Sequence, residues 1–80
     1  MIDKKKVEET VIKLAKRHVD KGTHVTLMSK LIDDLQLEHD YVYLITDIDR
    51  RYGIKIPPEA FESVRTISDL AELYYLHLSG

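Results

Sequence analysis

The chain of 80 residues has no cysteine and no tryptophan, and only three glycines and two prolines. Without cysteine it cannot form a disulfide, present a thiolate nucleophile or build a cysteine-based zinc site. Apolar runs stay well below the roughly 20 residues that a helix needs to cross a bilayer, and no signal-peptide core follows Met1. These absences predict a cytoplasmic protein with no membrane span.

Hydrophobic residues make up 44% of the chain, which is typical of an ordinary globular domain. Eighty residues predict a single domain, over 1–80, that buries about 60% of the surface of its unfolded chain. No internal repeat or low-complexity tract interrupts it.

Charge is distributed unevenly although the net charge is only −2. Residues 1–30 hold eight Lys or Arg against four Asp or Glu, and residues 31–80 hold four against ten. Two explanations remain open: the halves attract each other as solvated faces, or the acidic half docks basic partners. The lysines of the first 30 residues are interleaved with Glu8, Glu9 and Asp20, so we expect no nucleic-acid partner.

Apolar residues recur at helical spacing after residue 40. They are Tyr41, Leu44, Ile45, Ile48 and Tyr52. This stripe predicts a helix from Asp40 to Tyr52, with Asp40 as its N-cap and Gly53 as the left-handed residue that ends it.

Similar signals predict the other elements. Asp3 caps a first helix that Gly22 ends, and a long apolar connection from Thr23 to Gln36 covers the bundle, with a helical turn around residues 30–34. Pro58 begins a short helix, and Thr66 caps a last helix that runs to the end of the chain. The predicted core consists of Val7, Val11, Leu14, Leu35, Leu44, Ile45, Ile48, Phe61, Leu70 and Tyr74.

Four features occur in the order of a known family: Asp34-Leu35, Asp40, the aromatic Tyr52, and Ile56-Pro57. In this order they resemble the acyl carrier protein family, in which a serine within Asp-Ser-Leu, at the start of the second helix, is esterified with phosphopantetheine. The resemblance implies an all-α fold: an acyl-carrier-protein-like bundle of three longer helices and one short helix, with a long first loop.

The segment between Leu35 and Asp40 differs from the family's pattern. It is one residue shorter and reads Gln36-Leu37-Glu38-His39, so Glu38 or His39 stands where the resemblance implies the serine. Neither side chain has a hydroxyl. We therefore predict no cofactor and no cofactor-binding residue.

The resemblance implies a surface that binds proteins. It consists of Glu38, Asp40, Tyr43, Asp47 and Arg50. The first hypothesis is a monomeric, non-catalytic module that acts by protein–protein interaction beside lipid, polyketide or peptide assembly enzymes. The alternative is a genuine acyl carrier protein with an unusual attachment site.

Catalytic and metal sites are not predicted. The histidines are His18, His24, His39 and His77. No pair has the i, i+4 spacing of a helical metal site, and the adjacent residues 38–40 do not converge on one point. We expect a chain that is not an enzyme.

Aromatic side chains predict a closed interior. Tyr41, Tyr52, Phe61 and Tyr74 supply the volume to fill the space in which the family shelters an acyl chain, so no acyl tunnel is expected. The tyrosine hydroxyls should point outward, to water or to a backbone partner.

Overall fold

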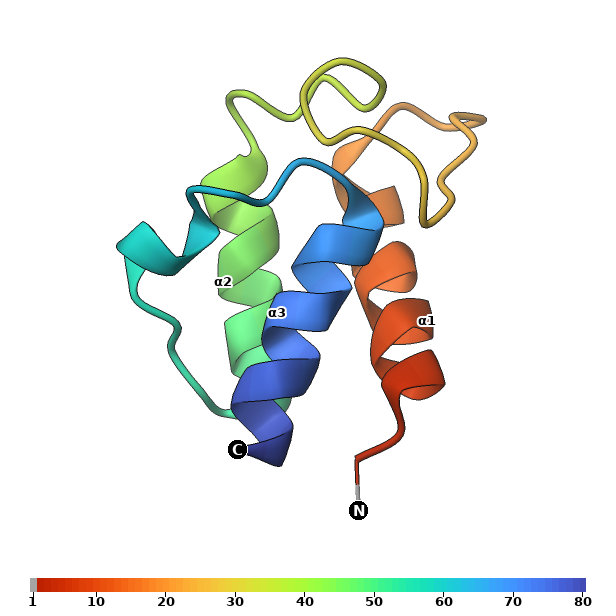
Figure 1. Cartoon of the computed structure of the whole chain (residues 1–80). Helices are drawn as coiled ribbons and strands as arrows, with labels where there is room; N and C mark the ends of the chain where they lie inside the picture. Colours follow the sequence, from red (N-terminus) through yellow and green to blue (C-terminus); the bar gives the residue numbers. More distant parts are fainter. Residues whose placement is uncertain (1) are drawn as a thin grey trace.

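The computed structural model of the protein describes residues 2–80. Three α-helices, α1 (Lys4–Ala15), α2 (Tyr41–Tyr52) and α3 (Ile67–Ser79), are accompanied by two 3₁₀ turns, η1 (Lys16–His18) and η2 (Pro58–Phe61). In Figure 1, the loop between η1 and α2 covers one end of the bundle, and both termini lie at the other end. The predicted all-α bundle of three longer helices, one short helix and a long first loop is confirmed.

The start of α1 follows the sequence prediction, whereas its end does not. The Asp3 carboxylate accepts a hydrogen bond from the Lys5 amide at 3.0 Å. The predicted end at Gly22 is wrong, because the helix tightens into η1 after Ala15 and Val19 is already extended. Gly22 instead occupies a turn with a φ of +95°, which a side chain would strain.

Helix α2 also has one predicted and one unexpected end. Gly53 is left-handed, with φ +66°, and its amide donates to the Asp49 carbonyl as predicted. Asp40 is the N-cap residue of α2, as predicted, but its side chain accepts no hydrogen bond from a helix amide. The predicted Asp40 side-chain cap is wrong because its backbone is helix-like, with φ −102° and ψ 0°, instead of extended.

The start of α3 is a reciprocal cap. The Thr66 hydroxyl accepts from the Asp69 amide at 3.1 Å, and the Asp69 carboxylate accepts from the Thr66 amide at 3.1 Å. Hydrogen bonds from the amides of Arg65 and Thr66 hold the pKa of the Asp69 carboxyl below its usual value. Pro58 occupies the first turn of η2, as predicted.

The long first loop is packed onto the bundle. Its backbone is bonded to the segment that begins α3: the Leu31 amide donates to the Arg65 carbonyl at 2.9 Å, and the Ile67 amide donates to the Ser29 carbonyl at 3.0 Å. Around residues 30–34 the Asp34 amide donates to the Lys30 carbonyl at 3.0 Å, which makes the single helical turn predicted there, although no helix continues from it. The predicted covering of the bundle is confirmed.

The core extends into this loop. Eight of the ten predicted core residues are buried, while Ile45 and Phe61 are only partly buried. The buried hydrophobic residues missing from the prediction are Ala15, Val25, Leu31, Leu37, Ile56, Ile67 and Ala71. Four of these lie outside the helices, where no helical period marks the inward side.

Replacing Ile48 by alanine tests the face assigned to α2. Ile48 is fully buried, so the I48A variant should lose about 2–5 kcal/mol of unfolding free energy in urea, through lost transfer energy and a cavity. The V42A control, on the exposed side of the same helix, should change stability by less than about 0.5 kcal/mol. Equal losses in the two variants would contradict the assignment.

Candidate functional site

The site suggested by the sequence lies at the start of α2 and is held there by Leu37. Leu37 is fully buried, and its amide donates to the Leu31 carbonyl at 3.0 Å. Its carbonyl accepts from the amide of Tyr41, the first residue of α2, at 2.8 Å, so Leu37 is bonded to both the first loop and the helix. Glu38 and His39, which follow it, are both exposed. Burial of Leu37 thus fixes which two side chains are presented to solvent before the helix.

These two side chains offer a carboxylate and an imidazole, and neither offers a hydroxyl. The nearest serine earlier in the chain, Ser29, is 8% exposed, and its Oγ accepts a hydrogen bond from the Thr26 amide at 2.9 Å. Ser29 is therefore a structural residue of the first loop. It is poorly placed for a modifying enzyme to reach.

The predicted partner-binding residues have different environments. Glu38, Tyr43 and Arg50 are exposed, and Asp40 is half-buried. The carboxylate of Asp47 lies 2.6 Å from Nε2 of His18, so it links α2 to η1. Sequence reasoning did not detect this pair, because its members are 29 residues apart and neither belongs to a motif.

A neighbouring apolar residue was also missed. Val42 is 68% exposed and lies beside Tyr43, which is 63% exposed, on the first turn of α2. The signal was present in the sequence, since Val42 falls outside the buried stripe of the helix. The start of α2 therefore presents an aromatic and an aliphatic side chain among charged residues.

Behind this surface, aromatic side chains fill the space between α2, η2 and α3. The ring of Tyr41 meets that of Phe61 edge to face, with ring centroids 6.2 Å apart. The ring centroids of Phe61 and Tyr52 each lie 6.4 Å from that of Tyr74. Whereas α1 packs closely against α3, α2 and α3 meet through these long side chains.

The hydroxyls of two of these tyrosines differ in their hydrogen bonding. The Tyr74 hydroxyl donates to Oδ1 of Asp49 at 2.5 Å, and burial and then Asp49 raise the pKa of this phenol far above its usual value. The Tyr41 hydroxyl is buried without a hydrogen-bond partner among residues 2–80, and burial raises its pKa to about 12. The prediction that such hydroxyls point outward to water or a backbone partner is therefore wrong for Tyr41.

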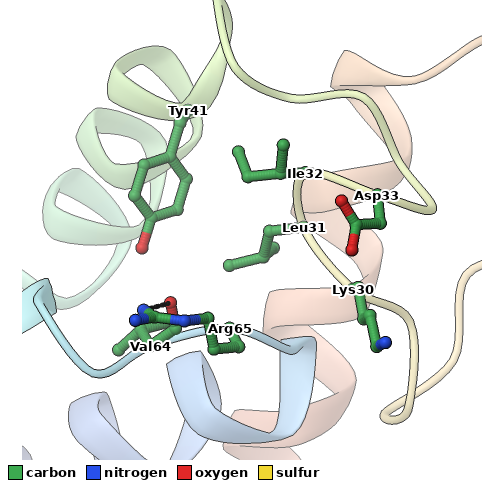
Figure 2. A pocket seen from close by; sticks show the side chains of 7 residues that line it. All are labelled: Lys30, Leu31, Ile32, Asp33, Tyr41, Val64 and Arg65. Carbon is green, nitrogen blue, oxygen red and sulfur yellow. Dashed lines mark hydrogen bonds between the residues drawn. The ribbon is translucent and has the colours of Figure 1, made fainter.

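A hollow of about 390 Å³ lies between the first loop and the start of α2. Figure 2 shows the Tyr41 ring along one side, with its hydroxyl directed toward Val64 and Arg65. The Arg65 guanidinium is already used in part, since it donates to the carbonyls of Glu62 at 2.7 Å and Val64 at 3.2 Å. Neither Glu38 nor His39 lines this hollow.

Comparison with known proteins decides the family. The chain is 31% identical to an acyl carrier protein of Brachyspira hyodysenteriae over 75% of its own length and 78% of that protein. It is 32% identical to an acyl carrier protein of Rickettsia canadensis over 84% of this chain and 80% of that protein. It is 33% identical to one of Rickettsia massiliae over 81% of this chain and 78% of that protein. The chain belongs to the acyl carrier protein family. No family model matches it.

Two further properties of this carrier-family chain bear on its site. Within residues 2–80, no group of three or more His, Asp or Glu side chains is placed to hold a metal ion. None of the helices described is both long and apolar enough to cross a membrane.

Two single hydroxyl deletions test the polar contacts behind the site. Y74F should cost about 1–3 kcal/mol in urea unfolding, because it leaves the half-buried Asp49 carboxylate without its donor. Y41F should be neutral or stabilise by about 1 kcal/mol, because it removes a buried hydroxyl that has no partner. A larger loss in Y41F than in Y74F would contradict the assigned contacts.

Proposed function

We propose that this member of the acyl carrier protein family is a non-catalytic module without the phosphopantetheine arm, acting by protein–protein interaction beside lipid, polyketide or peptide assembly enzymes. The observation that carries the proposal is the start of α2. There, the buried Leu37 leaves Glu38 and His39 exposed, and these are the residues that the resemblance puts in place of the family's serine.

Attachment of the arm needs a hydroxyl that attacks a phosphoryl group. Neither a carboxylate nor an imidazole at positions 38 and 39 supplies one, and Ser29 is buried in the first loop. The Glu38 carboxylate does supply a negative charge next to the positive end of the α2 dipole. In this proposal it takes over the electrostatic part of a phosphate's role and none of its carrier chemistry.

The partner-binding surface in the proposal contains Glu38, Asp40, Tyr43, Asp47 and Arg50, and Val42 extends it. Tyr43 and Val42 supply exposed apolar area, and tyrosine and arginine are enriched among the residues that dominate binding energy. Asp47 contributes by holding α2 against His18, which fixes the surface in place.

The interior supports an interaction role over acyl storage. Tyr52, Phe61 and Tyr74 occupy the space between α2 and α3, and Glu38 is not among the residues that line the hollow beside Tyr41. A chain that sheltered an alkyl group would need this aromatic packing to separate, at a cost in lost contacts.

A second candidate function is that of a genuine carrier with an unusual attachment site. The curated relatives at 31–33% identity are all named acyl carrier protein, which favours it. Intact mass distinguishes the two candidates.

Co-expression with a broad-specificity phosphopantetheinyl transferase should leave the protein at the mass of the bare chain, because positions 38 and 39 lack a hydroxyl. The Brachyspira hyodysenteriae carrier, treated in the same way, serves as the positive control and should gain one arm. Gain of one arm by this chain, abolished by mutation of a single residue, would overturn the proposal and identify the attachment site.

Binding to purified acyl-carrier-dependent enzymes tests the interaction part of the proposal. At least one ketosynthase, acyltransferase or adenylation enzyme in a panel should bind the bare protein. V42S/Y43S should weaken that binding at least about tenfold, since apolar contacts at the centre of an interface dominate its energy. E62Q, at an exposed residue outside α2, is the control and should have little effect. Binding that survives V42S/Y43S would place the interface elsewhere.

A further inference from the structure

The outer face of α1 and η1 carries an unusual concentration of positive charge. It consists of the exposed residues Lys5, Lys6, Lys13, Lys16 and Arg17, here called the α1 basic face. At 100° per residue these side chains fall within about a third of the helix circumference, along a length of about 18 Å. The opposite side of α1 is buried against the bundle.

The fold leaves these charges without partners. Among residues 2–80, Lys4 is the one Lys or Arg of α1 and η1 in an ion pair, 2.5 Å from Glu72 of α3. The five residues of the α1 basic face make no such contact. Of the basic residues of α1 and η1, Lys4 alone therefore forms a close ion pair with the acidic part of the chain.

Part of this charge opposes the stability of the helix. The first turn of α1 contains no acidic residue, and Lys5 and Lys6 lie there beside the positive end of the helix dipole. Cations at that end are unfavourable, and an anionic partner would remove the penalty. The Asp3 carboxylate offsets part of this penalty, and the remaining cations of the face lie in the last turns, where cations are favourable, so the penalty falls on Lys5 and Lys6.

The composition of the face selects the kind of partner. It presents no exposed apolar side chain, which an amphipathic helix needs in order to insert into a membrane. Glu9 is exposed in the middle of the face, and residues 31–80 carry ten acidic against four basic residues, so a dense array of phosphates is a poor match. An acidic protein helix holds separate carboxylates at the same three- and four-residue spacing and accommodates one basic residue opposite Glu9.

We propose that the α1 basic face is a second docking surface, which binds the acidic face of a helix in a partner protein. In Figure 1, α1 and α2 are separate helices of the bundle; they contact each other directly, and η1 meets α2 through the pair of His18 with Asp47. Binding at the α1 basic face goes beyond the function proposed above and does not depend on it; where both surfaces bind, the module connects two partners.

Titration of the ¹⁵N-labelled protein tests this proposal. The probe is a helix-forming Glu/Ala peptide with its glutamates on one face, at 150 mM salt. Amide shifts should cluster on residues 4–18, and K6E/K13E/R17E should weaken binding at least about tenfold, as loss of charge complementarity requires. The matched control K30E/R51E/K55E, with the same net charge and exposed positions, should weaken it by less than about threefold.

Parallel titrations use vesicles with half anionic phosphatidylglycerol and a DNA duplex. Circular dichroism confirms that both triple variants are folded. The proposal is overturned if the vesicles or the duplex bind more tightly than the peptide, if the two triple variants lose binding equally, or if residues 4–18 show no shift at millimolar peptide.

Discussion

Three backbone hydrogen bonds join the first loop to the segment that begins α3, and the arrangement of the functional surface depends on them. They link Leu31 to Arg65, Ile67 to Ser29 and Ser68 to Leu27, at 2.9–3.0 Å. Because Leu31 is held in this way, its carbonyl is in place to accept a hydrogen bond from the Leu37 amide. The Leu37 carbonyl in turn accepts a hydrogen bond from the amide of Tyr41, the first residue of α2. The start of α2 is thus positioned through the loop, although helix α2 and helix α3 meet mainly through long side chains.

The same arrangement separates two surfaces of different character. The start of α2 presents an aliphatic and an aromatic side chain among charges of both signs, whereas α1 presents cations without apolar area. Apolar groups supply most of the binding energy at an interface, and charges act mainly on association rate and selectivity. In our proposal the α2 surface therefore holds its partner more firmly, and the α1 basic face binds in a salt-sensitive way.

Local sequence signals predicted those parts of the fold that depend on interactions between residues close together in the sequence. The stripe of α2, the glycine at position 53 and the cap formed by Thr66 and Asp69 each involve residues within a few positions of one another. The burial of Leu37 and the pair between His18 and Asp47 depend on segments far apart in the chain, so no local period reveals them. Asp40 failed as a cap because the preceding turn, fixed by Leu37, gives it a helix-like backbone.

The candidate site was predictable in position and less so in composition. The order of Asp34-Leu35, Tyr52 and Ile56-Pro57 located the start of α2 through resemblance to the acyl carrier protein family, and the relatives support that family. Which side chains there are free depends on packing. Asp47 is engaged by His18, and Val42 is exposed beside Tyr43.

Amide hydrogen exchange tests most directly whether the junction of the first loop with α3 holds the start of α2. If it does, the amides of Leu31, Leu37 and Ile67 exchange as slowly as that of the buried Ile48, because they open only with the whole domain. If these three amides instead exchange as fast as that of the exposed Gly22, the loop opens independently and α2 is positioned by something else.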